Sequence, residues 1–234
     1  MSYRLCLAAL LSAGAVAAPS ATAAVVNING NAFELDQFTG ASVTYRSDGS
    51  VTFDGKFWDN AVGVDMVTLG ELAAGQFGSD PGDQVSLNST GAAGPDWLQL
   101  NYGTGITITA ANNQFIVYEI TSSSSGVDVE GTSFRVSFNG GAFVNASSAV
   151  ATHIPATTYP GTGAEDVNQI AFDLLTIGGL SSGDVLTSVR IENLDTGGST
   201  SDPDFIFAGV ITPEPGSLAL LGLGGLGVLR RRRA

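Results

Sequence analysis

The chain has 234 residues, of which 44% are hydrophobic, 13% are charged and 31 are glycine. Low charge with abundant glycine is typical of a turn-rich all-β protein, and the length suits a single domain. The formal net charge is −13, and between Val25 and Thr212 four basic residues stand against 21 acidic ones. This balance argues against nucleic acid as a partner, because phosphate binding needs a cationic surface.

The first 24 residues carry the three parts of a secretory signal peptide. Arg4 supplies the positive start, LCLAALLSAGAVAA is an apolar run, and ATAA (residues 21–24) offers small residues for cleavage. Cleavage is expected near residues 23–25 or earlier, near Ala17. We therefore predict a signal-peptide helix at residues 1–24 and export of the protein. The only cysteine, Cys6, lies in this segment, so the predicted mature chain has neither a disulfide nor a thiolate nucleophile.

Residues 25–211 show the pattern of strands separated by turns. Two segments favour β-hairpins: residues 42–53 around a central Asp-Gly pair, and residues 134–145 around Asn-Gly-Gly. These turn residues tolerate positive φ, and apolar and polar residues alternate on both sides of each turn.

Three further strands follow from hydrophobic patterning. QFIVYEI (residues 114–120) is a nearly continuous apolar run, as expected for a strand buried on both faces, and DFIFAGVI (204–211) is predicted to be the last strand. In DVLTSVRIEN (184–193) the pattern alternates. One face of this strand is predicted to carry Val185, Thr187, Val189 and Ile191. Ten to twelve strands at this spacing predict an all-β fold, a two-sheet sandwich of jelly-roll type over residues 25–211.

The sequence offers little for catalysis. His153 is the only histidine, and no serine lies in a Gly-x-Ser-x-Gly elbow, so neither a nucleophile with its base nor a paired-histidine metal site is indicated. We predict no catalytic role for His153 and no enzymatic activity.

Acidic pairs in loops are candidate calcium ligands, because calcium takes six to eight oxygen ligands. The pairs are Asp80 with Asp83, Asp128 with Glu130, and Asp202 with Asp204. None matches the twelve-residue calcium loop that ends in Glu, and solvated turn residues are the simpler interpretation. Asp202 and Asp204 form the leading candidate for a structural calcium ion; no other cofactor is predicted.

Aromatic side chains could stack on sugar rings, although most are expected to pack in the core. The candidates are Trp58, Trp97, Tyr102, Tyr118 and Tyr159. Trp97 follows a Gly-Pro turn, which makes it the leading candidate for an exposed ligand-binding aromatic.

The last 23 residues, 212–234, have three parts. Pro213, Glu214 and Pro215 come first, then 14 uncharged residues (216–229), then the basic run of Arg230, Arg231, Arg232 and Arg233. As a helix the apolar part would extend about 21 Å, short of the roughly 30 Å hydrocarbon core. We predict a short C-terminal transmembrane helix that pauses in the inner membrane, with the arginines as a membrane stop on the cytoplasmic side.

This order of Pro-Glu-Pro, apolar run and arginines resembles the PEP-CTERM sorting signal of Gram-negative bacteria that produce exopolysaccharide. The same tail is also catalogued as an ice-binding protein C-terminal domain. The resemblance implies that an exosortase-type peptidase of the inner membrane reads Pro213-Glu214-Pro215, cuts there and passes the protein to the cell surface or extracellular matrix. It also implies a variable β-rich cargo domain, to which QFIVYEI and DPDFIFAGV bear a looser likeness.

Together these features predict an exported structural or adhesive protein of the extracellular polysaccharide matrix. A carbohydrate-binding module is the alternative, and an exported polysaccharide hydrolase or lyase comes third. Extracellular polysaccharide is the expected partner of the domain in the first two cases.

Overall fold

The computed structural model describes residues 25–38, 42–46, 85–87, 95–121, 126–127, 132–155, 166–194 and 203–212. Within these ranges the chain is built of strands and short 3-10 segments, which confirms the predicted all-β class. The predicted signal-peptide helix (1–24) and apolar span (216–229) lie outside these ranges. None of the helices in the described ranges has the length and apolarity that crossing a membrane requires.

Twelve strands are described, within the predicted ten to twelve. They are β1 (Val25–Ile28), β2 (Asn31–Glu34), β3 (Ser42–Arg46), β4 (Val85–Ser86), β5 (Trp97–Thr107), β6 (Gln114–Thr121), β7 (Phe134–Phe138), β8 (Val144–Asn145), β9 (Val150–Ile154), β10 (Asp166–Asp173), β11 (Val185–Asn193) and β12 (Asp204–Val210). The 3-10 segments η1 (Leu35–Phe38) and η3 (Ala146–Ser148) follow β2 and β8.

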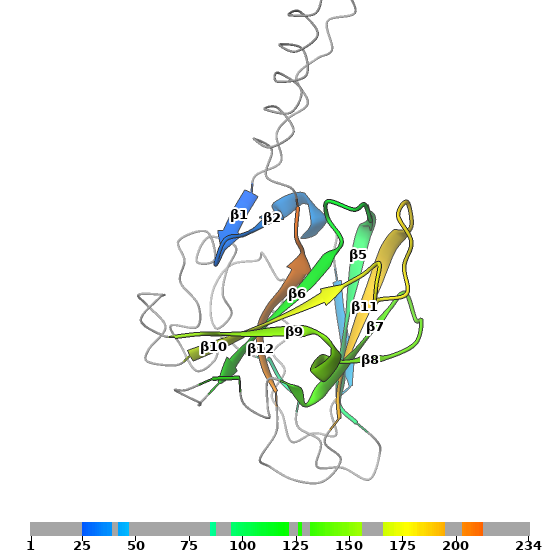
Figure 1. The fold of residues 1–234 in the computed structure, drawn as a ribbon. Coiled ribbons are helices and arrows are strands. Elements are labelled where there is room, and N and C mark those ends of the chain that lie inside the picture. Colours follow the sequence, from blue (N-terminus) through cyan, green and yellow to red (C-terminus); the bar gives the residue numbers. More distant parts are fainter. Residues whose placement is uncertain are drawn as a thin grey trace, which may run out of the picture.

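Ten of these strands form two five-stranded antiparallel sheets, seen as two layers in Figure 1. Sheet 1 has the order β4-β12-β6-β10-β9, and sheet 2 has the order β3-β5-β11-β7-β8. Strands β1 and β2 form a separate hairpin. From β4 onward, each of four strand pairs encloses the next one along the chain. The pairs are β4 with β12, β5 with β11, β6 with β10, and β7 with β8.

The two sheets enclose one core of buried apolar side chains. Aromatic rings connect them: Phe134 of sheet 2 lies with its ring centroid 5.0 Å from Phe205 of sheet 1, and Phe138 lies 5.6 Å from Phe115. Both pairs are edge-to-face, the arrangement that aromatic quadrupoles favour. This interlocked core fixes which face of each strand points outward.

The outer face of sheet 1 is covered by the β1–β2 hairpin and η1. Phe33 of β2 is fully buried against the rings of Tyr118 and Phe207, with centroids 6.4 and 5.0 Å away. Because the core lies on the other side, β6 is buried on both faces from Phe115 to Thr121. The prediction for QFIVYEI is therefore confirmed.

The last strand, β12, adapts to this cover in two ways. Its register against β6 shifts between Phe205 and Phe207, so Phe205 faces the inter-sheet core while Ile206 and Phe207 both pack under the hairpin. At Gly209 a Cβ atom would lie 3.1 Å from the Phe33 ring and 3.3 Å from Gln37 Oε1. The glycine thus lets the hairpin approach the strand closely.

The prediction for β11 is half wrong. Val189 and Ile191 are buried in the core as expected, but Val185 and Thr187 are exposed and Leu186 takes the core position. A register shift between Leu186 and Ser188 against β5 reverses the alternation. Such a bulge exchanges the faces of all residues beyond it.

The side chain of Asn139, in the turn after β7, supports this bulge. Asn139 Oδ1 accepts hydrogen bonds from the backbone N–H groups of Thr187 and Ser188 at 2.8 and 3.2 Å, and its Nδ2 donates to Val185 O at 2.8 Å. Asn139 and Gly140 have φ of 51° and 70°, which confirms the turn predicted between β7 and β8. Of the other predicted hairpin, only the first arm, β3, lies in the described residues.

Candidate functional site

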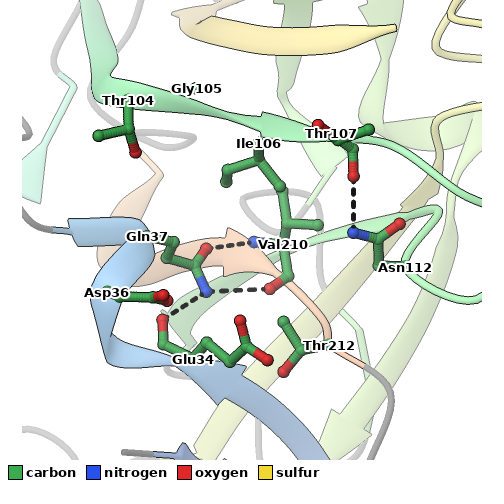
Figure 2. Close-up of a pocket in the computed structure, with 10 residues that line it drawn as sticks. All are labelled: Glu34, Asp36, Gln37, Thr104, Gly105, Ile106, Thr107, Asn112, Val210 and Thr212. Atoms are coloured by element: carbon green, nitrogen blue, oxygen red, sulfur yellow. Dashed lines mark hydrogen bonds between the residues drawn. The ribbon is translucent and has the colours of Figure 1, made fainter. Parts of the chain in front are cut away.

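A pocket of about 240 Å³ lies between the hairpin, β5 and the end of β12 (Figure 2). Its walls are mainly polar and come from four places in the chain. The lining residues are Glu34, Asp36, Gln37, Thr104, Gly105, Ile106, Thr107, Asn112, Val210 and Thr212.

Gln37 joins the hairpin segment to β12 beneath this pocket. Its Oε1 accepts a hydrogen bond from Val210 N–H at 3.0 Å, and its Nε2 donates to the carbonyl oxygens of Val210 and Glu34 at 3.2 and 3.0 Å, as the dashed lines in Figure 2 show. The amide thereby occupies the position of a neighbouring strand and pairs both backbone groups of Val210. Since buried backbone groups need partners, Gln37 fixes where the hairpin sits.

Two carboxylates give the pocket its electrostatic character. Burial raises the pKa of Glu34 above its ordinary value of 4.5, and the nearby charge of Asp36 raises it further. Both effects disfavour the ionised form. With the hydroxyls of Thr104, Thr107 and Thr212 alongside, the pocket offers mostly hydrogen-bonding oxygens.

The C-terminal end of the described chain lies at the same place. Ile211 N–H donates to Gln114 O of β6 at 3.0 Å, and Thr212 N–H donates to Ala32 O of β2 at 2.8 Å. The chain is therefore held by hydrogen bonds up to Thr212. Pro213, the first residue of the predicted sorting motif, follows at once, and the motif and its arginines lie outside the described residues.

A second candidate site lies on the outer face of sheet 2. Trp97 of β5, Glu192 of β11 and Arg135 of β7 stand opposite one another in register. Their neighbours Leu98, Ile191 and Val136 are fully buried in the core. Because successive side chains on a strand point to opposite faces, the three residues form a row across the outer face.

Charge and aromatic contacts tie this row together. Arg135 Nη2 lies 2.7 Å from Glu192 Oε1, and Arg190 Nη2 lies 3.5 Å from Glu192 Oε2. The Arg135 guanidinium stacks 4.4 Å above the Phe143 ring, and that of Arg190 lies 4.4 Å above Trp97. We call these five residues the Arg–aromatic row. Its three charges sum to +1, although the domain as a whole is strongly acidic.

The structure distinguishes among the predicted aromatic candidates. Trp97 is partly buried and belongs to the Arg–aromatic row, whereas Tyr102 and Tyr118 are core residues with no surface for stacking. Burial also raises the pKa of Tyr102 well above its ordinary value, which keeps the hydroxyl protonated. Trp58 and Tyr159 lie outside the described residues.

His153 stands on β9 opposite Asn168 of β10, and its Nε2 lies 3.1 Å from Asp166 Oδ2. Asn168 in turn donates to the buried carboxylate of Glu119 at 2.9 Å. The pair of His153 and Asp166 joins two neighbouring strands of sheet 1. Whether it has any catalytic role is not tested by this geometry, and the absence of activity stays a prediction.

Of the acidic residues predicted as calcium ligands, only Asp204 lies among the described residues. Asp204 opens β12 opposite Ser86, whereas Asp202, both acids of residues 80–83 and both acids of residues 128–130 lie outside. Among the described residues no group of three or more His, Cys, Asp or Glu side chains is arranged to hold a metal ion. Calcium binding by Asp202 and Asp204 therefore stays a prediction.

Sequence reasoning identified Trp97 but missed its partners. Arg135, Arg190 and Glu192 are ordinary polar residues in alternating strands, and only strand register brings them together. The sequence nevertheless singled out both arginines, because Arg135 and Arg190 are two of only four basic residues between positions 25 and 212. Gln37 had no such signal.

Comparison with known families gives a match to the PEP-CTERM protein-sorting motif at residues 212–233. This confirms the resemblance seen in the tail: the chain carries the signal of an exported protein that is sorted to the surface through exosortase-type processing. No curated protein and no solved structure matches the chain significantly.

Proposed function

We propose that this chain, with its PEP-CTERM motif, is a structural or adhesive protein of the extracellular polysaccharide matrix. The observation that carries the proposal is the sorting motif itself, attached directly to a folded antiparallel domain. The last described residue, Thr212, is hydrogen-bonded to β2 and is also the first residue of the matched motif. A domain displayed in this way travels to the surface as cargo of the tail.

We further propose that residues 25–211 form a jelly-roll domain. The nested pairs from β4–β12 to β7–β8 support this, because winding one long antiparallel hairpin into two sheets produces that order. Lectin domains are among the proteins that use this architecture. The carbohydrate-binding alternative therefore stays open beside the structural role.

The proposed route includes a pause in the inner membrane. Residues 216–229 insert into the membrane. Arg230 to Arg233 resist translocation because each arginine costs several kcal/mol at mid-membrane. The peptidase then cuts at Pro213-Glu214-Pro215. Replacing Glu214 with Ala should leave the full-length protein in the membrane fraction, as should deletion of the host's exosortase. Replacing the four arginines with Ser should instead let the tail pass through uncut.

The test is mass spectrometry of the mature protein from its own host, with both termini sequenced. The expected product begins near Val25 and lacks the arginines. A mature protein that keeps Arg230 to Arg233 in wild-type cells refutes processing and makes the tail a permanent anchor. A matrix role further requires that most of the mature protein fractionates with the extracellular polysaccharide.

Two minor parts of the proposal have their own tests. Turnover of a polysaccharide panel by the mature protein, abolished by one carboxylate substitution, would establish an enzyme and overturn the structural role. Millimolar calcium should raise the melting temperature if Asp202 and Asp204 bind it, as any ligand of the native state does. A double Ala variant should then lose that shift.

A further inference from the structure

The Arg–aromatic row carries a net charge of +1 in a domain that is strongly acidic as a whole. Three of the four basic residues between positions 25 and 212 lie on strands of sheet 2: Arg46 on β3, Arg135 on β7 and Arg190 on β11. The strand register places Arg46 opposite Trp97. The side chains of Arg135 and Arg190 thus place two positive charges on one sheet of a domain with 21 acidic residues.

The two guanidinium groups of the row are held in place and are still accessible. Their side chains are each 35% exposed, whereas Glu192 between them is 6% exposed. Within the described part of the chain, each guanidinium reaches Glu192 through Nη2 and rests on an aromatic ring. The Nη1 groups therefore stay available as donors, and planar guanidinium is suited to carboxylate or sulfate.

The surroundings of the row suit a sugar chain. Gln99 and Asn101 continue along β5 on the same face and hydrogen-bond each other at 2.9 Å; Ser188 stands opposite Asn101 on β11. Phe143 is 39% exposed and can contact the apolar face of a sugar. From β5 to β8 the sheet spans about 14 Å at the usual strand spacing, which leaves room for an oligosaccharide.

We propose that this face of sheet 2 binds an anionic polysaccharide, with Arg135 and Arg190 on its carboxylate groups. The inference rests on the proposed matrix function and names the polymer class that the protein would hold there. Local charge complementarity favours an anionic polymer, because two accessible guanidiniums lie side by side here in an otherwise strongly acidic domain. Glu192 is a positioning residue that holds both guanidiniums.

The test uses mature protein purified from its own host and immobilised polygalacturonate, a polyuronate, with dextran as the neutral polymer. The wild-type protein should bind polygalacturonate at least about tenfold more tightly than dextran, with affinity that falls as salt rises. Arg190→Gln should weaken this binding about tenfold, since it removes one charge-assisted contact. Arg135→Gln, a second and independent variant, should do the same.

Lys56→Gln is the control for net charge, because it makes the same change in net charge at a residue that is not part of the Arg–aromatic row. It should leave polygalacturonate binding within about twofold of wild type. Equal binding to dextran, equal losses in the Lys56 and arginine variants, or tighter binding to double-stranded DNA than to polygalacturonate would each overturn the proposal. Circular dichroism and melting temperature of each variant distinguish lost binding from lost folding.

Fractionation of the host separates failure of this inference from failure of the matrix role. Wild-type protein that stays with the matrix but does not bind polygalacturonate overturns the anionic-glycan face and leaves the proposed function intact. Wild-type protein that is absent from the matrix fraction overturns the proposed function itself.

Discussion

The outer faces of the two sheets differ in what lies on them. On sheet 1 the outward side chains of β6 and β12 are apolar, and Phe33 of the β1–β2 hairpin and Phe38 of η1 cover them. On sheet 2 most outward side chains of the central strands are polar, and the Arg–aromatic row with Trp97 remains partly exposed. The comparison indicates that sheet 1 uses its outer face for stability, while sheet 2 leaves its outer face available for binding.

The covered face also organises the two ends of the domain. The hairpin and η1 are the first described parts of the chain: Gln37 of η1 binds Val210, and Ala32 of the hairpin binds Thr212. The beginning of the predicted mature chain thus holds the residue that precedes the sorting motif. Folding of the hairpin onto sheet 1 is what fixes the position of the tail's first residue.

The largest expected loss of stability comes from a substitution on the covered outer face of sheet 1. Phe33→Ala removes a fully buried ring that contacts Tyr118 and Phe207, and should lower the free energy of unfolding by about 3–5 kcal/mol. Urea denaturation of the mature protein measures this loss. Val150→Ala, at a side chain that is 70% exposed, is the control and should change stability by less than about 0.5 kcal/mol. Similar losses in both variants would mean that the hairpin does not cover sheet 1.

Substitutions of two glutamines, Gln37 on the covered side of sheet 1 and Gln99 on the outer face of sheet 2, should give the next largest difference in the free energy of unfolding. Gln37→Ala leaves the buried N–H and C=O groups of Val210 without their side-chain partner and should cost about 2 kcal/mol. Gln99→Ala on sheet 2 removes one hydrogen bond to Asn101 at a partly exposed position, with an expected loss of about 0.5 kcal/mol. Equal losses by denaturant titration would show that Gln37 does not fix the hairpin.

The row itself should contribute modestly to stability. Glu192→Gln removes the negative charge that Arg135 and Arg190 share, and the side chains of both arginines are 35% exposed. Solvent screening therefore limits the expected loss to about 1 kcal/mol, below the 3–5 kcal/mol of a fully buried pair. Denaturation at low and high salt checks the assignment, because the difference from wild type should shrink as salt rises. A larger, salt-independent loss would identify the row as part of the core.

The sequence predicts the covered face of sheet 1 better than the outer face of sheet 2. The apolar run of β6 indicates burial on both sides, because no polar residue of QFIVYEI except Glu119 interrupts it, and the structure agrees. The bulge in β11 could not be predicted, since Asn139 of a distant turn supports it. The Arg–aromatic row depends on cross-strand register, which long-range pairing sets, so only Trp97 was identified.

The smallest expected effect concerns Glu34, on the hairpin that covers sheet 1. Burial, followed by the charge of Asp36, raises the pKa of Glu34 above 4.5 in the folded protein. The folded state therefore binds this proton more tightly than the unfolded chain does. The free energy of unfolding must then fall as the pH rises from the unfolded pKa through the raised folded pKa, and the penalty is complete above both values.

Glu34→Gln removes this titration, so the variant should be slightly more stable than wild type at neutral pH and should show a flatter pH dependence. Urea denaturation of both proteins from about pH 4 to about pH 7 measures the difference, which should vanish at the acidic end. Asp36→Asn is the control and should give part of the same flattening, because it removes only the smaller cause. If Glu34→Gln instead lowers stability at neutral pH, the ionised carboxylate makes a favourable contact in the pocket. The hairpin would then be held on sheet 1 by charge as well as by its buried rings.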